Sequence, residues 1–271
     1  MSQPDYLLLG HFTRDMLPDG TTRAGGTSLY AGFTAQRLGM RVAVVSAAAD
    51  LPEDWPQDIA IHTLSDRDTP TFENRYTPSG RVQILHTASL PITTGDIPSA
   101  WRAPPIVHLA PIAAETPEDL VFAFPHSLLG MTPQGMMRAW GNLPGPVQYR
   151  LWMPDAEVLE RIDALVMSIE DLRGDEQTAQ QYAASCRLVA LTRGARGATL
   201  FIDGQPHEVA AAPATEHDPT GAGDVFAAAL LTRLYETGDP LLAAAFAAQV
   251  AARSVEGPGV SAVPPRAALS V

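Results

Sequence analysis

The sequence predicts an α/β fold in which helices cover both faces of a central, mostly parallel sheet. Short continuous apolar runs recur between helical stretches, as is typical of strands buried on both faces. Two strands with alternating side chains interrupt this rhythm and indicate a separate small β-element. The 271 residues suit one large domain or two small ones. Because no linker is evident, we expect a single domain over residues 1–271.

The first half of the chain carries the predicted strand–helix–strand unit and the lid. The helix spans residues 27–38 and stops at Gly39, and a β-hairpin spans 72–77 and 81–87 around a turn at 78–80. We expect the hairpin and residues 11–23 to form a small β-lid. The segments 91–105 and 125–146 are rich in Pro and Gly and are interpreted as connections. The apolar runs predicted as strands here and in the centre are Tyr6–Leu9, 42–46, Ile106–Leu109, 121–124 and Ala164–Ser168.

The C-terminal part continues with strands at Leu188–Thr192, 198–203 and 207–211, the last two joined by a turn at Asp203-Gly204. A small-residue loop at 218–224 then leads directly into an apolar helix over 225–235, which stops at Gly238. A second helix follows at Pro240–Ser254. The loop before the first of these helices is the most informative feature of the sequence.

The charged residues exclude several chemistries. All 18 basic residues are Arg, so no lysine is present for a G-x-x-x-x-G-K-[ST] loop, a protein-kinase strand or a Schiff base. The net charge of −12 disfavours nucleic acid and anionic membranes as partners. The single Cys186 removes disulfide frameworks and Cys-rich metal sites. The start Met1-Ser2-Gln3-Pro4 lacks a basic region and no spanning helix is evident, so we expect a cytoplasmic protein.

The residue types of the loop point to anion binding beside a base. Gly221, Ala222 and Gly223 allow the backbone N–H groups to approach a ligand at the positive end of a helix. Asp224 places a carboxylate next to that site, where it can take a proton from an attacking hydroxyl. A tight turn followed by a capping Asp explains the same residues equally well.

Four segments together resemble the PfkB, or ribokinase-like, carbohydrate kinase family. Residues 218–224 resemble its D-T-x-G-A-G-D signature, with Pro219 in place of Thr, and Gly25-Gly26 through Arg37-Leu38-Gly39 resembles its first motif. Residues 191–197 resemble the nucleotide-side T-x-G-x-x-G turn, and 256–260 the adenine-side loop. The resemblance implies a ribokinase-like three-layer sandwich with a small β-lid.

The resemblance also implies roles for individual residues. Asp224 corresponds to the catalytic base, with Gly221, Ala222 and Gly223 as the anion hole. A monovalent cation such as K⁺ is implied at Asp218 and Thr220, although Pro219 departs from the pattern. The other implied residues are Asp15, Gly25 and Gly26 for the acceptor substrate, Thr192, Gly194 and Gly197 for the nucleotide, and Arg138 for the transferred phosphate.

One family segment is altered here. The family's N-x-x-E stretch, which organises Mg²⁺ through water, corresponds to Ser168-Ile169-Glu170-Asp171. Its oxygen ligands remain, so the resemblance implies Mg²⁺ held through water by Asp171, with Glu170 as a substitute.

The implied function is an ATP-dependent kinase that transfers the γ-phosphoryl group to a hydroxyl of a small sugar or polyol. Residues 107–111 and 133–135 resemble the inositol-kinase-like branch. A nucleoside kinase and a non-catalytic sugar- or nucleotide-binding sensor are the alternatives. A dinucleotide oxidoreductase would need G-x-G-x-x-G after the first strand, where only Gly10 stands. Pairing of lid strands between subunits would make a homodimer.

Overall fold

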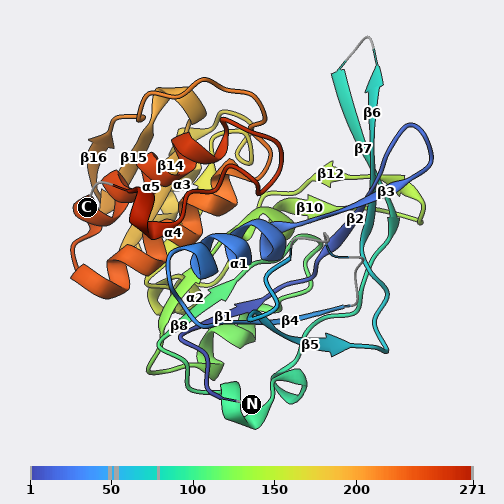
Figure 1. Ribbon diagram of the computed structural model, residues 1–271, viewed down its shortest axis with the longest axis horizontal. Coiled ribbons are helices and arrows are strands. Elements are labelled where there is room, and N and C mark those ends of the chain that lie inside the picture. Colours follow the sequence, from blue (N-terminus) through green and yellow to red (C-terminus); the bar gives the residue numbers. More distant parts are fainter. Residues whose placement is uncertain (1, 48–50, 52–54, 78–79, 270–271) are drawn as a thin grey trace.

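The computed structural model describes residues 2–47, 51, 55–77 and 80–269 (Figure 1). Its main sheet has nine strands in the order β16-β15-β14-β13-β9-β8-β1-β4-β5. All neighbours from β14 to β5 are parallel, whereas β15 and β16 are antiparallel. The strands are β1 (Tyr6–Leu9), β4 (Val42–Ala47), β5 (Ala60–Leu64), β8 (Ile106–Leu109), β9 (Leu128–Met131), β13 (Ala164–Ser168), β14 (Leu188–Thr192), β15 (Ala198–Ile202) and β16 (Gln205–Val209).

Helices cover both faces of this sheet and confirm the three-layer sandwich. Tyr6 and Leu8 of β1 pack into the core beneath one helix layer, whereas Leu7 and Leu9 pack into the core on the other face, because successive side chains point to opposite sides of a strand. The first layer comprises α1 (Thr27–Arg37), α4 (Ala222–Thr237) and α5 (Pro240–Ser254), and the second α2 (Ala156–Arg161) and α3 (Glu176–Tyr182). The 3-10 turns are η1 (Thr94–Asp96), η2 (Ser99–Trp101), η3 (Glu118–Ala123), η4 (Pro133–Met137), η5 (Gly194–Arg196) and η6 (Arg266–Ala268).

A separate five-stranded sheet has the order β11-β7-β6-β2-β3 and lies beside the main sheet (Figure 1). Strand β2 pairs in parallel with β6, so the segment after β1 and the predicted hairpin form one sheet. Pro78 and Ser79 of the predicted turn lie outside the described residues. The strands are β2 (Thr13–Met16), β3 (Thr22–Gly25), β6 (Thr71–Thr77), β7 (Gly80–Thr87) and β11 (Gly145–Pro146), and a further pair consists of β10 (Arg138–Ala139) and β12 (Gln148–Tyr149).

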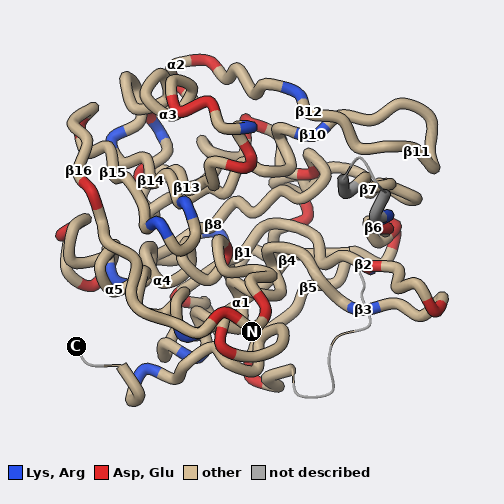
Figure 2. Tube along the Cα trace, turned by 90° about the horizontal axis from the view of Figure 1, so that it is seen from above, with Lys and Arg blue, Asp and Glu red and all other residues tan. Residues whose placement is uncertain are grey.

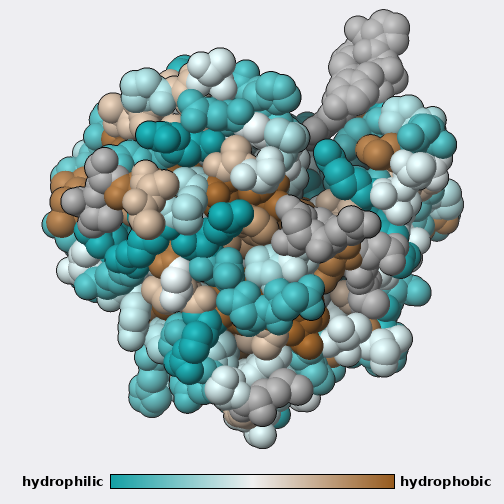
Figure 3. Space-filling model, viewed as in Figure 1, coloured by the Kyte–Doolittle hydropathy of each residue, from teal (hydrophilic) through white to brown (hydrophobic). Residues whose placement is uncertain are grey.

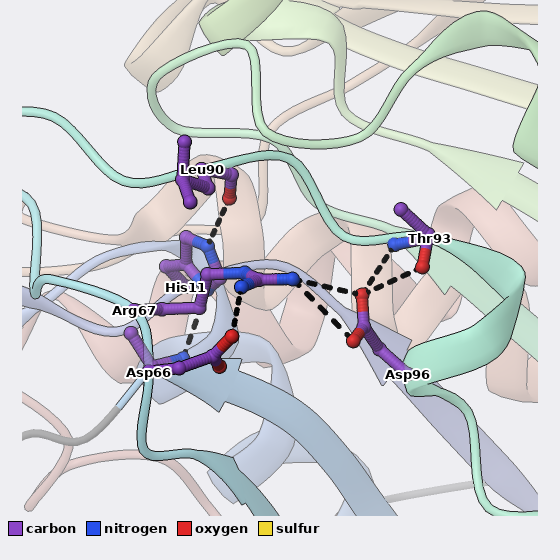
Figure 4. A network of polar contacts seen from close by, with 7 residues as sticks. His11, Asp66, Arg67, Leu90, Thr93 and Asp96 are labelled. Atoms are coloured by element: carbon purple, nitrogen blue, oxygen red, sulfur yellow. Dashed lines mark hydrogen bonds and ion pairs between the residues drawn. The ribbon is translucent and has the colours of Figure 1, made fainter.

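Hydrogen bonds and ion pairs link the segments that connect the two sheets (Figure 4). Arg67, which precedes β6, forms ion pairs with Asp66 and, at 3.5 Å, with Asp96 in η1. His11, between β1 and β2, hydrogen-bonds the Leu90 carbonyl at 3.2 Å and accepts from the Ala47 N–H at 2.9 Å. The segments that enter and leave the small sheet are therefore held against each other.

The prediction of a strand at residues 121–124 was wrong. This segment lies in η3 and its flank, and the strand of the sheet is β9, inside the segment interpreted as a connection. Pro117 precedes η3, and Glu118 and Asp119 occupy its first turn, where acidic side chains favour a helical start. Leu120, Val121 and Phe124 are still buried. Because burial alone does not distinguish a short helix from a strand, the apolar run misled the prediction.

The surface carries the expected acidic character. Figure 2 shows acidic residues at many positions along the chain, and the face in Figure 3 is mostly hydrophilic with small apolar areas between polar ones. Within the described parts of the chain, no helix is long and apolar enough to cross a membrane.

Candidate active site

The loop 218–224 leads into α4 three residues earlier than predicted, so Ala222, Gly223 and Asp224 form the first turn of a 16-residue helix. Gly221 precedes it with φ 77°, in the left-handed region that favours glycine. A Cβ on Gly221 would lie 2.2 Å from Cδ1 of Tyr30, so a larger residue does not fit against that ring. The Ala222 N–H donates to Pro219 O at 3.2 Å and would have to share or leave that bond to bind an anion.

Asp224 has the electrostatic properties of a base at neutral pH. Its side chain is half-buried, and burial raises its pKa to about 7. This value includes the negative charge of Asp171, which also raises the pKa, and a hydrogen bond with the Thr27 side chain and the charge of Arg138, which lower it. A carboxyl group with this pKa is poised to accept a proton near pH 7.

Asp15 lies on β2, opposite Arg23 of β3 and beside Gly25. A Cβ on Gly25 would lie 2.6 Å from Asp15 Oδ2, so this glycine gives the carboxylate its space. Burial raises the pKa of Asp15, against the opposing charges of Arg23 and Arg138 and a hydrogen bond from Thr13. Gly26 continues into α1 with φ 91°.

Tyr30 of α1 interacts electrostatically with the residues on β2 and β3 and with the aspartates before and in the first turn of α4. It is buried, and that burial raises the pKa of its hydroxyl to about 12. The charge of Arg23 lowers this pKa, and the charges of Asp218, Asp224 and Asp15 raise it. Tyr30 therefore lies within electrostatic reach of Asp15, Asp218 and Asp224, and its ring lies against Gly221 in the loop before α4.

Asp171 forms a closed reciprocal turn with Ser168 at the end of β13. Its Oδ2 accepts from the Ser168 N–H at 2.9 Å, and its own N–H donates to Ser168 Oγ at 3.1 Å. Gln134 Nε2 donates to Asp171 Oδ1 at 2.9 Å. Glu170 is exposed. Each Asp171 oxygen retains accepting capacity, so these residues fit a hydrated Mg²⁺ that is held through water.

The described residues do not offer a site in which protein side chains alone would coordinate a metal ion. Among the residues that the structure describes, no group of three or more His, Cys, Asp or Glu is arranged to hold a metal ion. The side chains of Asp171 and Glu170 therefore fit an ion that takes most of its ligands from water and donor phosphates, as Mg²⁺ commonly does.

Asp218 joins two of the sequence motifs. Its Oδ1 accepts from the Thr220 N–H and its Oδ2 from the Gly259 N–H, both at 3.0 Å. Although burial opposes it, these hydrogen bonds hold the pKa of Asp218 below its usual value. Asp218 thus orders the loop against the segment after α5, and a K⁺ site at Asp218 and Thr220 stays a prediction.

The predicted nucleotide-side residues form the turn between β14 and β15. Thr192 pairs in register with Ser168, so this turn lies next to the Asp171 segment. Gly197 has φ 83°, and a Cβ there would lie 2.2 Å from Val209 O. Gly194 lies in η5, and Arg193, which directly precedes it, donates to Glu176 at 3.1 Å and to Thr199 at 2.6 Å.

Arg138 acts electrostatically on both Asp15 and Asp224. Its Nη1 donates to Ile112 O at 2.8 Å, and its guanidinium lies 5.3 Å from the centroid of the Phe72 ring. A contact with a transferred phosphate stays a prediction.

A cavity of about 550 Å³ lies elsewhere, at the amino ends of β8, β9 and β13. Its two arginines already bind backbone carbonyls: Arg161 donates to Ser127 O at 3.1 Å and Arg102 to Ile97 O at 3.2 Å. The candidate site instead uses the carboxyl ends of β13 and β14, where open α/β sheets bind ligands. We therefore place the active site there despite the size of this cavity.

Sequence reasoning missed Thr27, Tyr30, Arg23 and Gln134 as members of the site. Thr27 and Tyr30 follow the Gly25-Gly26 pair at a spacing that puts them on one face of α1. That spacing was visible in the sequence, but their contacts with α4 depend on how the two helices pack.

Known proteins resemble this chain in sequence and in fold. Residues 156–267 match the profile described as pfkB family carbohydrate kinase. The chain is 27% identical over 263 residues to the cytidine kinase of Thermococcus kodakarensis, covering 88% of this chain and 90% of that protein. It is 26% identical over 246 residues to the fructokinase of Escherichia coli, covering 81% and 75%. A pyrophosphate-dependent kinase of the ribokinase family, solved with a pyrophosphate analog and myo-inositol, superposes with a TM-score of 0.77 at 24% identity, covering 97% and 98%.

Fold and site together define a phosphotransferase of the ribokinase fold that uses an alcohol group as acceptor. Within that class, residues 156–267 match the pfkB family of carbohydrate kinases, the family that the sequence motifs resemble.

Proposed function

We propose that this protein transfers a phosphoryl group to a hydroxyl of a small sugar or polyol. The observation that carries the proposal is the position of Asp224, whose pKa is raised to about 7, in the first turn of a helix whose N-terminus favours an anion. General-base chemistry and oxyanion binding are thereby adjacent.

In the proposed mechanism, Asp15, Gly25 and Gly26 bind the acceptor. Asp224 takes the proton as the acceptor hydroxyl attacks phosphorus, and Gly221, Ala222 and Gly223 stabilise the charge on the transferring group. Arg138, whose charge acts on both Asp15 and Asp224, would add positive charge near the transferred phosphate. Asp171, with Glu170 nearby, would hold Mg²⁺ through water; the ion supplies charge neutralisation on the donor phosphates.

ATP is the donor that we propose, bound along Thr192, Gly194 and Gly197 and the loop that Asp218 holds. Pyrophosphate is the second candidate, because a structural relative with the same fold is pyrophosphate-dependent. Arg193 and Arg196 flank the donor turn and would attract the distal phosphate of either compound.

A polyol or sugar is favoured over a nucleoside as the acceptor. Arg23, Thr13 and Gly25 lie around Asp15 and suit hydroxyl groups. The aromatic rings of Phe72, which pairs with Asp15, and of Tyr30 are buried and supply no exposed stacking face. Because one relative is a cytidine kinase, a nucleoside is included among the acceptors to be tested.

We further propose a single domain over residues 1–271, in which the small sheet acts as a lid that excludes water. A homodimer would form through the lid strands, and K⁺ would support the loop at Asp218 and Thr220. A cytoplasmic location would supply the donor, and neither nucleic acid nor membrane takes part.

The test is a matrix of donors and acceptors. Purified protein is incubated with Mg²⁺, with ATP or pyrophosphate, and with myo-inositol, ribose, fructose or cytidine, and phosphorylated product is measured directly by mass spectrometry. We expect one sugar or polyol to be phosphorylated, and Asp224→Asn to abolish that product. Turnover of cytidine alone would replace the polyol assignment, and binding of donor and acceptor without any product would favour a sensor.

A further inference from the structure

We propose that the first turn of α1 positions the N-terminus of α4, with Thr27 holding the carboxylate of Asp224 and Tyr30 seating Gly221. Both are positioning residues, since neither needs to touch the reacting atoms. The inference rests on the proposed function for its catalytic consequence, and on packing alone for its structural part.

Thr27 and Tyr30 share one face of α1. They are three residues apart, which places them one above the other on the helix surface. Thr27 is 2% exposed and directly follows Gly26, the residue that begins the helix. Helix α1 packs against α4, and the Thr27 side chain lowers the pKa of Asp224 by hydrogen bonding, so Thr27 acts on the third residue of α4.

Tyr30 lies one turn after Thr27 in α1, and its ring contacts Gly221, the residue before α4. Cδ1, Cγ and Cε1 of its ring would lie 2.2, 2.3 and 2.6 Å from a Cβ on Gly221. The ring is 5% exposed and fixed on a helix, whereas Gly221 lies in a loop. The rigid element therefore sets the position of the loop that precedes the predicted anion hole.

Both contacts have the same chemical consequence. The base and the first amide groups of α4 must be aligned with an incoming phosphoryl group, and small displacements of such groups slow the reaction strongly. Because α1 directly follows Gly25-Gly26, the segment predicted to bind the acceptor is continuous with the helix that aligns the groups proposed to activate it.

The catalytic test compares matched variants on the donor and acceptor found above. Thr27→Val keeps the shape and removes the hydroxyl, and Thr27→Ser restores it. Tyr30→Leu removes the ring, and Tyr30→Phe keeps it. We expect Thr27→Val and Tyr30→Leu to lower kcat by about 10-fold to 100-fold with less than about a 2-fold change in donor KM, and both conservative variants to retain kcat. An unchanged kcat in Thr27→Val and Tyr30→Leu, or equal losses in the conservative variants, would overturn the proposal.

Two thermodynamic cycles test the contacts without any activity. Urea unfolding midpoints are compared for Gly221→Ala in the wild-type and Tyr30→Leu backgrounds, and for Asp224→Asn in the wild-type and Thr27→Val backgrounds. We expect the cost of Gly221→Ala to shrink when the ring is absent, and the effect of Asp224→Asn to change when Thr27 lacks its hydroxyl. Additive effects in both cycles would overturn the proposal even if the enzyme is active. If the wild type phosphorylates nothing, the proposed function is wrong, and the cycles alone decide the positioning role.

Discussion

The carboxylate of Asp15 occupies the space that a side chain on Gly25 would need. A Cβ on Gly25 would lie 2.6 Å from Asp15 Oδ2 and 2.9 Å from Thr13 Oγ1. The glycine and the aspartate, ten residues apart, therefore form one unit on neighbouring strands β2 and β3. This relationship gives Gly25 a specific role that a flexible loop glycine would not have.

Gly25→Ala is therefore expected to displace Asp15 and weaken acceptor binding. Losing a hydrogen bond to a charged group costs about 1.5–3 kcal/mol, so the acceptor KM should rise about 10-fold to 100-fold while the donor KM stays within about 2-fold. Initial-rate kinetics measure both. Gly141→Ala is the control, because nothing lies within 4 Å of a Cβ there. Equal acceptor KM values in wild type and Gly25→Ala would contradict the role of Asp15.

Asp224→Asn should reduce kcat by about 10²- to 10⁴-fold, because the amide cannot accept the acceptor proton. Donor binding, measured by isothermal titration calorimetry, should stay nearly unchanged. Asp119→Asn, an exposed site in η3, serves as the matched control. If Asp224→Asn retains more than about 5% of the wild-type kcat, far above the loss expected for a general base, Asp224 is not the base.

The raised pKa of Asp224 predicts an acid limb in the rate profile. Only the carboxylate accepts a proton, so kcat/KM for the acceptor should fall below about pH 7, the pKa of Asp224, approaching a 10-fold loss per pH unit. Initial rates from pH 5 to 9 at fixed ionic strength measure this. A profile that stays flat down to pH 5 would show that no group with this pKa acts as the base.

The raised pKa of Asp224 also predicts that the stability difference between wild type and Asp224→Asn depends on pH. The folded protein holds the Asp224 proton more tightly than the unfolded chain, so stability is lost as pH rises from the unfolded value of 3.8 towards about 7. Asp224→Asn removes this loss. Relative to wild type, the variant should therefore be more stable at pH 8 than at pH 4, as measured by urea unfolding; the reverse order would mean that Asp224 is ionised without penalty.

His108 predicts a second, opposite pH effect in the core. It is fully buried between the Tyr6 hydroxyl at 2.9 Å and the Thr132 hydroxyl at 3.2 Å, and burial lowers its pKa to about 3. The unfolded chain binds its proton first, so stability falls as pH drops below about 6.5. Between pH 7 and 5 this amounts to about 2 kcal/mol. His108→Gln should lose that component in urea unfolding, and His126→Gln, at an exposed site, should keep it.

Asp171 predicts a change in metal dependence. Asp171→Asn should raise the Mg²⁺ concentration for half-maximal activity by about 10-fold, because the charge of the carboxylate near the donor phosphates is lost. Glu170→Gln, on the exposed neighbour, separates the two candidates. The measurement is initial rate against free Mg²⁺ after EDTA treatment. If only Glu170→Gln shifts the curve, the ion is held by Glu170 instead.

Most elements followed from local pattern. Strands β1, β4, β8, β13 and β14 were predicted correctly, because each is a continuous apolar run. Such runs are typical of parallel strands that are buried on both faces of a sheet. The segment 121–124 failed because Pro117, Glu118 and Asp119 favoured a helical turn over a strand with the same burial. Strand β9 was missed because its flanks are rich in Pro and Gly.

The sequence by itself determined that the chain carries an aspartate, Asp224, at the start of one helix and a glycine pair directly before another. Only the tertiary structure decided that Tyr30 lies against Gly221, that Asp218 holds Gly259, and that Gln134 binds Asp171. Spacing along the chain fixes which residues share one element, because helix and strand geometry is local. Contacts between elements depend on side-chain packing across distant segments, which no local pattern encodes.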